Sequence, residues 1–167
     1  MISVEYCQLL ARYNHWMNER ILALAGEMTD EERKEDRGAF FGSIHRTLNH
    51  MIWGDSIWLG RFTGDPYAVP AFGADMHESF DALLRERMTI DTAILGWAAK
   101  VAPSWLTGTL EYRSASDGAQ RRLPRWIGVT HLFQHATNHR GQVATLMRQD
   151  GRDVGVTDLP WMPGVMH

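Results

Sequence analysis

Apolar residues recur at spacings of three, four or more residues along most of the chain, which is the period of an amphipathic helix. Breakers divide this pattern: Gly26 near the end of the first segment, the run Thr63-Gly64-Asp65-Pro66 after the second, and Pro103 after the third. Ser43 and Asp75 are expected to cap the second and third helices. The pattern predicts four long helices, at residues 3–28, 44–62, 76–102 and 124–150.

Two shorter features lie between these helices. Thr29 followed by Glu32 is typical of a capping box that opens a short helical turn. Residues 106–123 carry Thr-, Tyr- and Arg-bearing stretches around Ser116-Asp117-Gly118, which favours a small hairpin or another irregular excursion before the last helix. Four long helices in 167 residues predict an all-α four-helix bundle. Because there is no repeat, low-complexity tract or linker, we expect residues 1–167 to form a single domain.

Composition and charge exclude several classes of protein. The lone cysteine, Cys7, rules out an internal disulfide and a CxxC motif. The formal net charge of −3 provides no basic field for nucleic acid, and we expect the basic cluster of Arg121, Arg122 and Arg125 to be a solvated face. No apolar run reaches the ~20 residues that span a bilayer. The N-terminus lacks the features of a signal peptide, so we expect a cytoplasmic protein that binds no membrane.

Histidine is abundant, and two histidines share one face of the last helix. His135 and His139 are four residues apart and project toward the edge of the apolar face, whereas His131 lies on the polar side. This spacing lets two imidazoles reach one metal ion, as the paired histidines of HExxH do. Histidines at a core edge are more often simply hydrogen-bonded, so the spacing alone leaves metal binding open. A third ligand from another helix would favour a metal site.

The second helix offers His45 and His50. His50 lies beside Trp53 and Ile57 on a second, weaker apolar face, a position that permits a metal ligand without singling it out. Two apolar faces are more than one bundle core requires, and together with 7 Trp and 9 Met they predict a homodimer. Asp55 lies near the centre of the main apolar stripe, so we expect it to pair with an Arg or with a His N–H.

Three segments together resemble the DinB family, among the DinB/YfiT-like metalloenzymes: SIHRTLNHMIWGDSIWLGRF, HLFQHATNHRGQVATLM and GVTDLP. The most specific parts are the LNH of the second helix and the H-x-x-x-H-R-G-Q of the fourth. The resemblance implies a four-helix bundle, often homodimeric, in which three histidines hold one divalent metal. Carried over to this sequence, the metal ligands are His50, His135 and His139. Many relatives have a histidine where this chain has Asn138, which we expect on the polar side, away from the metal.

Three neutral imidazoles leave a coordination position open, which is the pattern of a catalytic metal site, and they favour Zn, Ni, Fe or Cu over Mg or Ca. Relatives in the wider superfamily include thiol-dependent S-transferases and a mycothiol-dependent isomerase. The resemblance therefore implies a metal-dependent enzyme that activates a low-molecular-weight thiol for transfer to a small electrophile. The alternatives are a hydrolase with a bound hydroxide, in which Asp55, Gln142 or a side chain of the first helix supports the ligands, and a metal- or ligand-binding bundle without turnover. No catalytic residue is assigned, since Cys7 matches no motif.

Arg140 is a charged residue inside the apolar face of the last helix. Its aliphatic stem can cover apolar surface while its guanidinium pairs with a carboxylate, for which Asp55 and Asp158 are the expected partners. We therefore expect Arg140 to be a structural anchor rather than a substrate-binding group. Three further histidines match no pattern and are expected to be ordinary: His15, His77 and His167.

Overall fold

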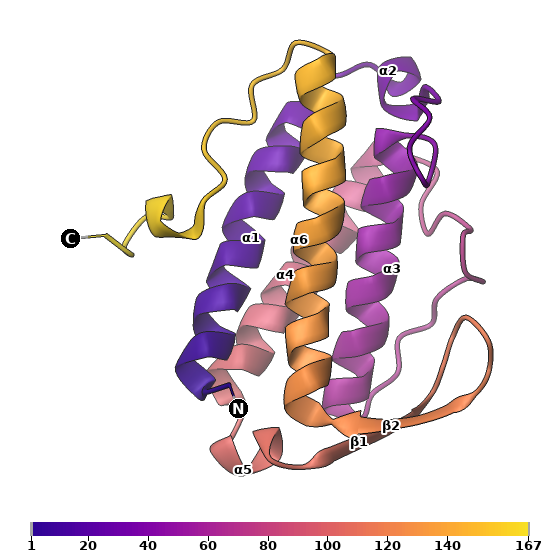
Figure 1. Ribbon diagram of the computed structural model, residues 1–167. Coiled ribbons are helices and arrows are strands. Elements are labelled where there is room, and N and C mark those ends of the chain that lie inside the picture. Colours follow the sequence, from indigo (N-terminus) through magenta and orange to yellow (C-terminus); the bar gives the residue numbers. More distant parts are fainter. Residues whose placement is uncertain (1, 167) are drawn as a thin grey trace.

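The long helices of the computed structural model, which describes residues 2–166, follow the apolar pattern of the sequence (Figure 1). The elements are α1 (Val4–Gly26), α2 (Asp30–Lys34), α3 (Ile44–Thr63), α4 (Phe80–Lys100), α5 (Pro103–Leu106), β1 (Thr109–Arg113), β2 (Gln120–Pro124), α6 (Arg125–Gln149) and a 3₁₀ turn (Leu159–Trp161). The predicted all-α four-helix bundle is confirmed, with a two-stranded hairpin before the last helix. His167 lies outside the described residues.

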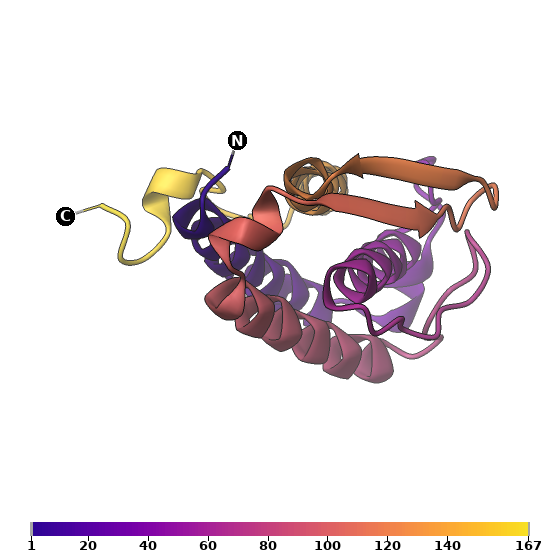
Figure 2. The same cartoon turned by 90° about the horizontal axis from the view of Figure 1, so that it is seen from below.

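Each long helix packs against two others. Both α1 and α3 pack on α4 and on α6, and side chains such as Ile52, Ile90 and Leu132 are buried between them. Segment 64–79 returns along the outside of α3, so α3 and α4 run in the same direction (Figure 1). This connection leaves α3 and α6 side by side, the arrangement on which the candidate site depends (Figure 2). No helix within residues 2–166 is long and apolar enough to cross a membrane.

Local signals in the sequence determine most helix ends. The hydroxyls of Ser3 and Ser43 cap α1 and α3 by accepting hydrogen bonds from backbone N–H groups of the first turn. Thr29 and Glu32 form the predicted capping box of α2. At the other end of α3, Gly64 adopts the left-handed conformation with φ 78°, which favours glycine.

The predicted cap of the third long helix at Asp75 is wrong. The cap of α4 is Ser79, whose hydroxyl accepts a hydrogen bond from the Ala82 N–H at 3.2 Å. The chain cannot start the helix earlier because the preceding loop is tied to α3. There the His77 N–H donates to the Asn49 side-chain oxygen at 2.9 Å.

The hairpin of β1 and β2 leads directly into α6. Its strands are antiparallel and pair Leu110 with Leu123, and Gly118 in the predicted turn has a φ of 70°. Leu110 is buried against α6, where a Cβ on Gly128 would lie 3.4 Å from it. Pro124 ends β2 and α6 begins at the next residue, and from there the hairpin extends past α3 on the side where α6 lies (Figure 2).

A chain of polar side chains lies in the interior of the bundle. The Arg87 guanidinium on α4 pairs with Asp55 of α3 (Nη1 to Oδ2, 2.6 Å) and with Asp91 one turn along α4 (Nη2 to Oδ1, 2.7 Å). All three residues are at most 3% exposed. Asp91 also accepts a hydrogen bond of 2.9 Å from Asn18 of α1. Asp55 therefore has the pairing expected from its place in the apolar stripe, and its partner is an arginine.

Arg140 joins the same network from α6, but not through the predicted carboxylates. Its Nη1 donates to the side-chain oxygens of Asn14 and Asn18, the latter at 3.2 Å. The predicted pairings with Asp55 and Asp158 are wrong, because Asp55 is taken by an arginine of α4 and Asp158 is exposed in the tail. Two asparagines, together with Thr137 of α6, accept hydrogen bonds from the buried guanidinium instead, and the asparagines connect α6 to α1.

Replacement of Arg87 by Met should destabilise the bundle strongly, because it leaves two buried carboxylates without their cation. Breaking a buried ion pair by removing one partner costs about 3–5 kcal/mol. The matched control is Arg122→Met, since the Arg122 side chain is 72% exposed and pairs at 3.4 Å with the equally exposed Glu111. Such surface pairs contribute little. Urea unfolding followed by circular dichroism measures both variants, and equal midpoints would contradict the assigned role of the network.

Candidate metal centre

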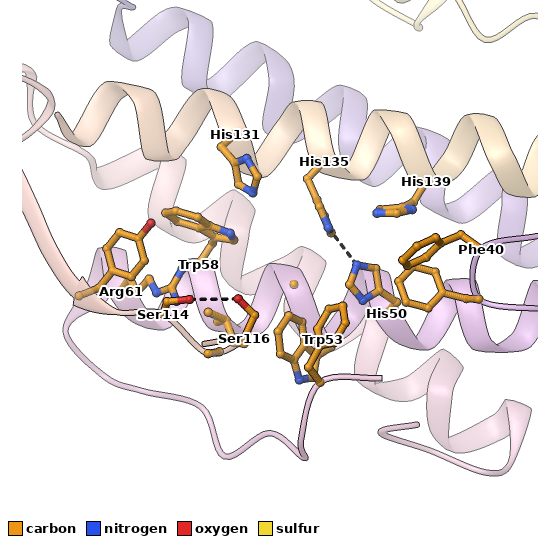
Figure 3. A pocket seen from close by; sticks show the side chains of 16 residues that line it. Phe40, His50, Trp53, Trp58, Arg61, Ser114, Ser116, His131, His135 and His139 are labelled. Carbon is orange, nitrogen blue, oxygen red and sulfur yellow. Dashed lines mark hydrogen bonds between the residues drawn. The ribbon is translucent and has the colours of Figure 1, made fainter. Parts of the chain in front are cut away.

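Three histidine side chains from two helices converge on one point (Figure 3). His50 comes from α3, and His135 and His139 come from α6, one turn apart. One ring nitrogen of each lies within 4.8 Å of the other two, and the Nε2 atoms of His50 and His135 are 3.0 Å apart. The structure thus brings together the three residues that the resemblance indicated. No other group of three or more His, Cys, Asp or Glu side chains converges in this way within residues 2–166.

Helix packing and one glycine explain this convergence. Residues four apart on α6 face the same side, and that side packs along α3. Gly54 of α3 provides space for the His135 ring, since a Cβ at this position would lie only 2.7 Å from Cε1 of His135. Gly54 was not predicted from the sequence to belong to the site. An isolated glycine inside a helical pattern is nevertheless a signal of close packing that could have been used.

Aromatic side chains enclose the His50 ring. Phe41, from the connection before α3, stacks on His50 with the ring centroids 4.0 Å apart, and Trp53 of α3 lies at 5.7 Å. Phe72, from segment 64–79, meets the ring edge-on at 5.8 Å. Sequence reasoning missed Phe41 and Phe72 because both lie in connections that lack a helical pattern. Only the return of these connections to α3 brings them to the site.

A cavity of about 330 Å³ opens beside the histidine cluster, at the lower end of the range for small-molecule sites. At its far end lie Arg61 of α3 and, from the hairpin turn, Ser114 and Ser116 (Figure 3). Trp53 and Ile57 form part of its wall, so the second apolar face of α3 is used within one chain. This removes one ground for the predicted homodimer, which stays a prediction from the Trp and Met content.

His131 lines the same cavity without joining the cluster. It is exposed, in agreement with its predicted place on the polar side of α6, and its ring centroid lies 4.8 Å from Trp58 and 5.6 Å from His135. His45 has a structural contact, since its Nε2 is 2.9 Å from the backbone oxygen of His77. Neither His131 nor His45 therefore belongs to the group of converging ring nitrogens.

Burial favours the neutral forms of His50 and His135. Burial, with a smaller effect of His139, lowers the pKa of His50 to about 4. Burial, followed by the effects of His139, His50 and His131, lowers the pKa of His135 to about 3. Both rings are therefore unprotonated at pH 7, the form that binds metals. The Nδ1 of His139 donates to Gln142 Oε1 at 2.8 Å, which leaves its Nε2 as the lone-pair nitrogen.

This set of nitrogens suits a divalent transition metal. Ligand atoms about 2.1 Å from one ion lie roughly 3–4 Å from one another, and the separations in the cluster are close to that range. The group contains three imidazoles and, among the described residues, no Cys, Asp or Glu as a fourth ligand. Such a set leaves room for an external molecule on the cavity side.

The fold and the site define a helical-bundle protein whose histidine cluster is compatible with metal binding. Its sequence matches the DinB family over residues 1–165, and the chain belongs to that family. It is 26% identical over 156 residues to protein DinB of Bacillus subtilis (strain 168). The alignment covers 89% of this chain and 88% of that protein.

A solved structure shares the fold. The crystal structure of a DinB-like protein from Bacillus cereus ATCC 10987 matches with a TM-score of 0.61. The match covers 85% of this chain and 91% of the other, at 20% sequence identity. At that identity the likeness shows the fold alone, so the chemistry must be argued from the residues of this site.

Proposed function

We propose that His50, His135 and His139 bind one divalent transition metal ion and that the protein is a metal-dependent enzyme acting on small molecules. In the proposed reaction, a low-molecular-weight thiol is activated for transfer to a small electrophile. The proposal is carried by the convergence of three imidazole nitrogens at the wall of a cavity. Membership of the DinB family supports it. Zn, Ni and Fe are the metals that such ligands suit.

A divalent ion held by three neutral imidazoles has an open coordination position and lowers the pKa of a bound thiol or water. The residues around the cluster shield and orient the three imidazoles. Phe41 and Trp53 cover the His50 ring and exclude water from it, which strengthens electrostatic interactions in the site. Gln142 orients His139 through the hydrogen bond to Nδ1, and the absence of a side chain at Gly54 leaves space for the His135 ring.

The described wall of the cavity offers no activated nucleophile. Cys7 is buried on α1 and does not line the cavity, and burial raises the pKa of its thiol to about 11. Ser114 and Ser116 are hydrogen-bonded to each other at 3.1 Å on the hairpin. The attacking group is therefore expected to come from outside the chain. An external thiol is our proposal, and a bound water, as in a hydrolase, is the alternative.

Turnover with an external thiol tests the reaction. Protein purified without chelator and loaded with Zn²⁺ or Ni²⁺ should consume glutathione or cysteine together with a chromogenic aryl halide, and a chelator should abolish the reaction. Hydrolysis of an ester panel without added thiol would support the hydrolase instead. One equivalent of bound metal with neither activity would contradict both enzymes and leave a metal-binding bundle.

Replacing any one of the three cluster histidines by Ala should remove most of the bound metal. Loss of a direct ligand should weaken binding by more than the roughly 10–100-fold that follows loss of an outer hydrogen-bonding partner. The matched control is His131→Ala, one turn along α6 from His135 and in the same cavity. Elemental analysis of the purified variants measures the metal content.

Two outcomes would contradict this assignment of ligands. An equal loss of metal from His131→Ala would mean that the wrong side of α6 was chosen. Full retention of metal in His50→Ala would mean that the ligand from α3 is another residue.

Gly54→Ala should also weaken metal binding, because the added methyl group would displace the His135 ring. The matched control is Gly141→Ala on α6, where an added Cβ meets no atom within 4 Å and the change favours the helix by up to about 1 kcal/mol. Competition for Zn²⁺ with a chromophoric chelator should show a fall of roughly 10–100-fold for Gly54→Ala only. Unchanged affinity in both variants would show that the His135 ring does not need this space.

A further inference from the structure

The end of the cavity opposite the histidine cluster contains an arginine packed against two aromatic rings. The Arg61 guanidinium lies over the ring of Trp58 at 4.5 Å and over the ring of Tyr112 at 3.9 Å. Trp58 and Arg61 belong to α3, and Tyr112 belongs to β1, so the hairpin is needed to complete this arrangement. The two rings are 5.4 Å apart with their planes at 64°, so they contact the guanidinium from two directions and restrict its position at this end of the cavity.

Within residues 2–166, Arg61 has no carboxylate partner. Its side-chain hydrogen bond runs from Nη2 to the backbone oxygen of Arg113 at 3.3 Å, although a guanidinium has five N–H donors. Two arginines of the hairpin differ in this respect. Arg121 pairs with Asp117 at 2.6 Å, and Arg122 pairs with Glu111 at 3.4 Å. Arg61 thus brings an uncompensated positive charge into the cavity.

The surroundings of Arg61 disfavour its positive charge in the absence of an anion. Burial lowers the pKa of the Arg61 guanidinium from its ordinary value, against a smaller opposing effect of Tyr112, yet an arginine is still charged at pH 7. Ser114 and Ser116 line the same end of the cavity and are hydrogen-bonded to each other, and the hydroxyl that is not the donor in that bond can donate to a ligand. Together these groups match the acceptor oxygens of a carboxylate.

We propose that Arg61, with Ser114 and Ser116, binds a carboxylate of the small molecule whose reacting atom lies at the histidine cluster. The inference rests on the proposed function and adds a substrate class to it, namely small anionic molecules. Gly54, which faces His135, is seven residues from Arg61 along α3, a rise of about 10 Å. The substrate therefore carries its carboxylate several bonds away from the atom that reacts.

A matched pair of probes tests the proposal. Mercaptohexanoate and mercaptohexanol have the same chain and thiol and differ in the terminal carboxylate. Calorimetric titration of the Zn²⁺-loaded protein should show about tenfold tighter binding of mercaptohexanoate, the size expected of one charge-assisted contact in a partly solvated site. Equal affinities in the wild-type protein would overturn the proposal without recourse to any variant.

Variants locate the effect. The preference for mercaptohexanoate should disappear in Arg61→Gln, be retained in part in Arg61→Lys, and stay unchanged in Arg122→Gln, which alters an exposed arginine of the hairpin. A full preference in folded Arg61→Gln, checked by circular dichroism, would show that Arg61 only supports the aromatic rings. That outcome would overturn the proposal.

Treatment with a chelator distinguishes a failure of the proposed carboxylate site from a failure of the proposed metal site. In chelator-treated protein both thiols should bind more weakly, while the preference for the carboxylate persists. If neither affinity falls, the proposed metal site is wrong and the preference still tests Arg61. If the affinities fall and no preference remains, the carboxylate site is wrong and the metal site stands.

Discussion

The arrangement of the four long helices depends on a buried network centred on Arg87. Its guanidinium lies between Asp55 of α3 and Asp91 of α4, and Asn18 links Asp91 to α1. Through Asn18 the network also reaches Arg140 of α6. Apolar side chains can slide or rotate against one another at little cost, whereas a buried charge without its partner costs several kcal/mol. The network therefore specifies one rotation of each helix among the many that apolar packing alone would allow.

The site depends on that rotation because the two features occupy adjacent positions on both helices. On α3, Gly54 faces His135 and the next residue, Asp55, joins the network. On α6, His139 joins the cluster and the next residue, Arg140, joins the network. Consecutive residues of a helix point about 100° apart, so fixing one face fixes the other. Satisfaction of the buried charges thus places the imidazoles on the side where α3 and α6 meet the cavity.

The sequence predicted the features that depend on local order. Helical periodicity, the caps of α2 and α3, the hairpin turn and the pairing of His135 with His139 on one face all follow from spacing within one segment. Features that depend on contacts between segments could not be predicted from the sequence pattern. His50 needed a family resemblance, Arg140 was assigned carboxylate partners, and the cap at Asp75 was wrong because a loop contact to α3 delays the helix. A charged residue in an apolar stripe indicates that a partner is present, but the sequence does not identify that partner.

Two kinds of structure contribute to the cavity, and they carry different information. The histidine cluster stands on α3 and α6, whose relative rotation the buried network fixes. Part of the remaining wall comes from other helical residues, among them Trp53, Trp58 and Arg61 of α3. The rest comes from the connections and the hairpin: Phe41 before α3, Phe72 in segment 64–79, and Tyr112 with the hairpin turn. Connections can change in sequence and length without disturbing a helical core. A bundle of this kind can therefore keep one arrangement of metal-binding nitrogens while the part of the wall formed by connections changes, so likeness of fold does not transfer a substrate from one member of the family to another.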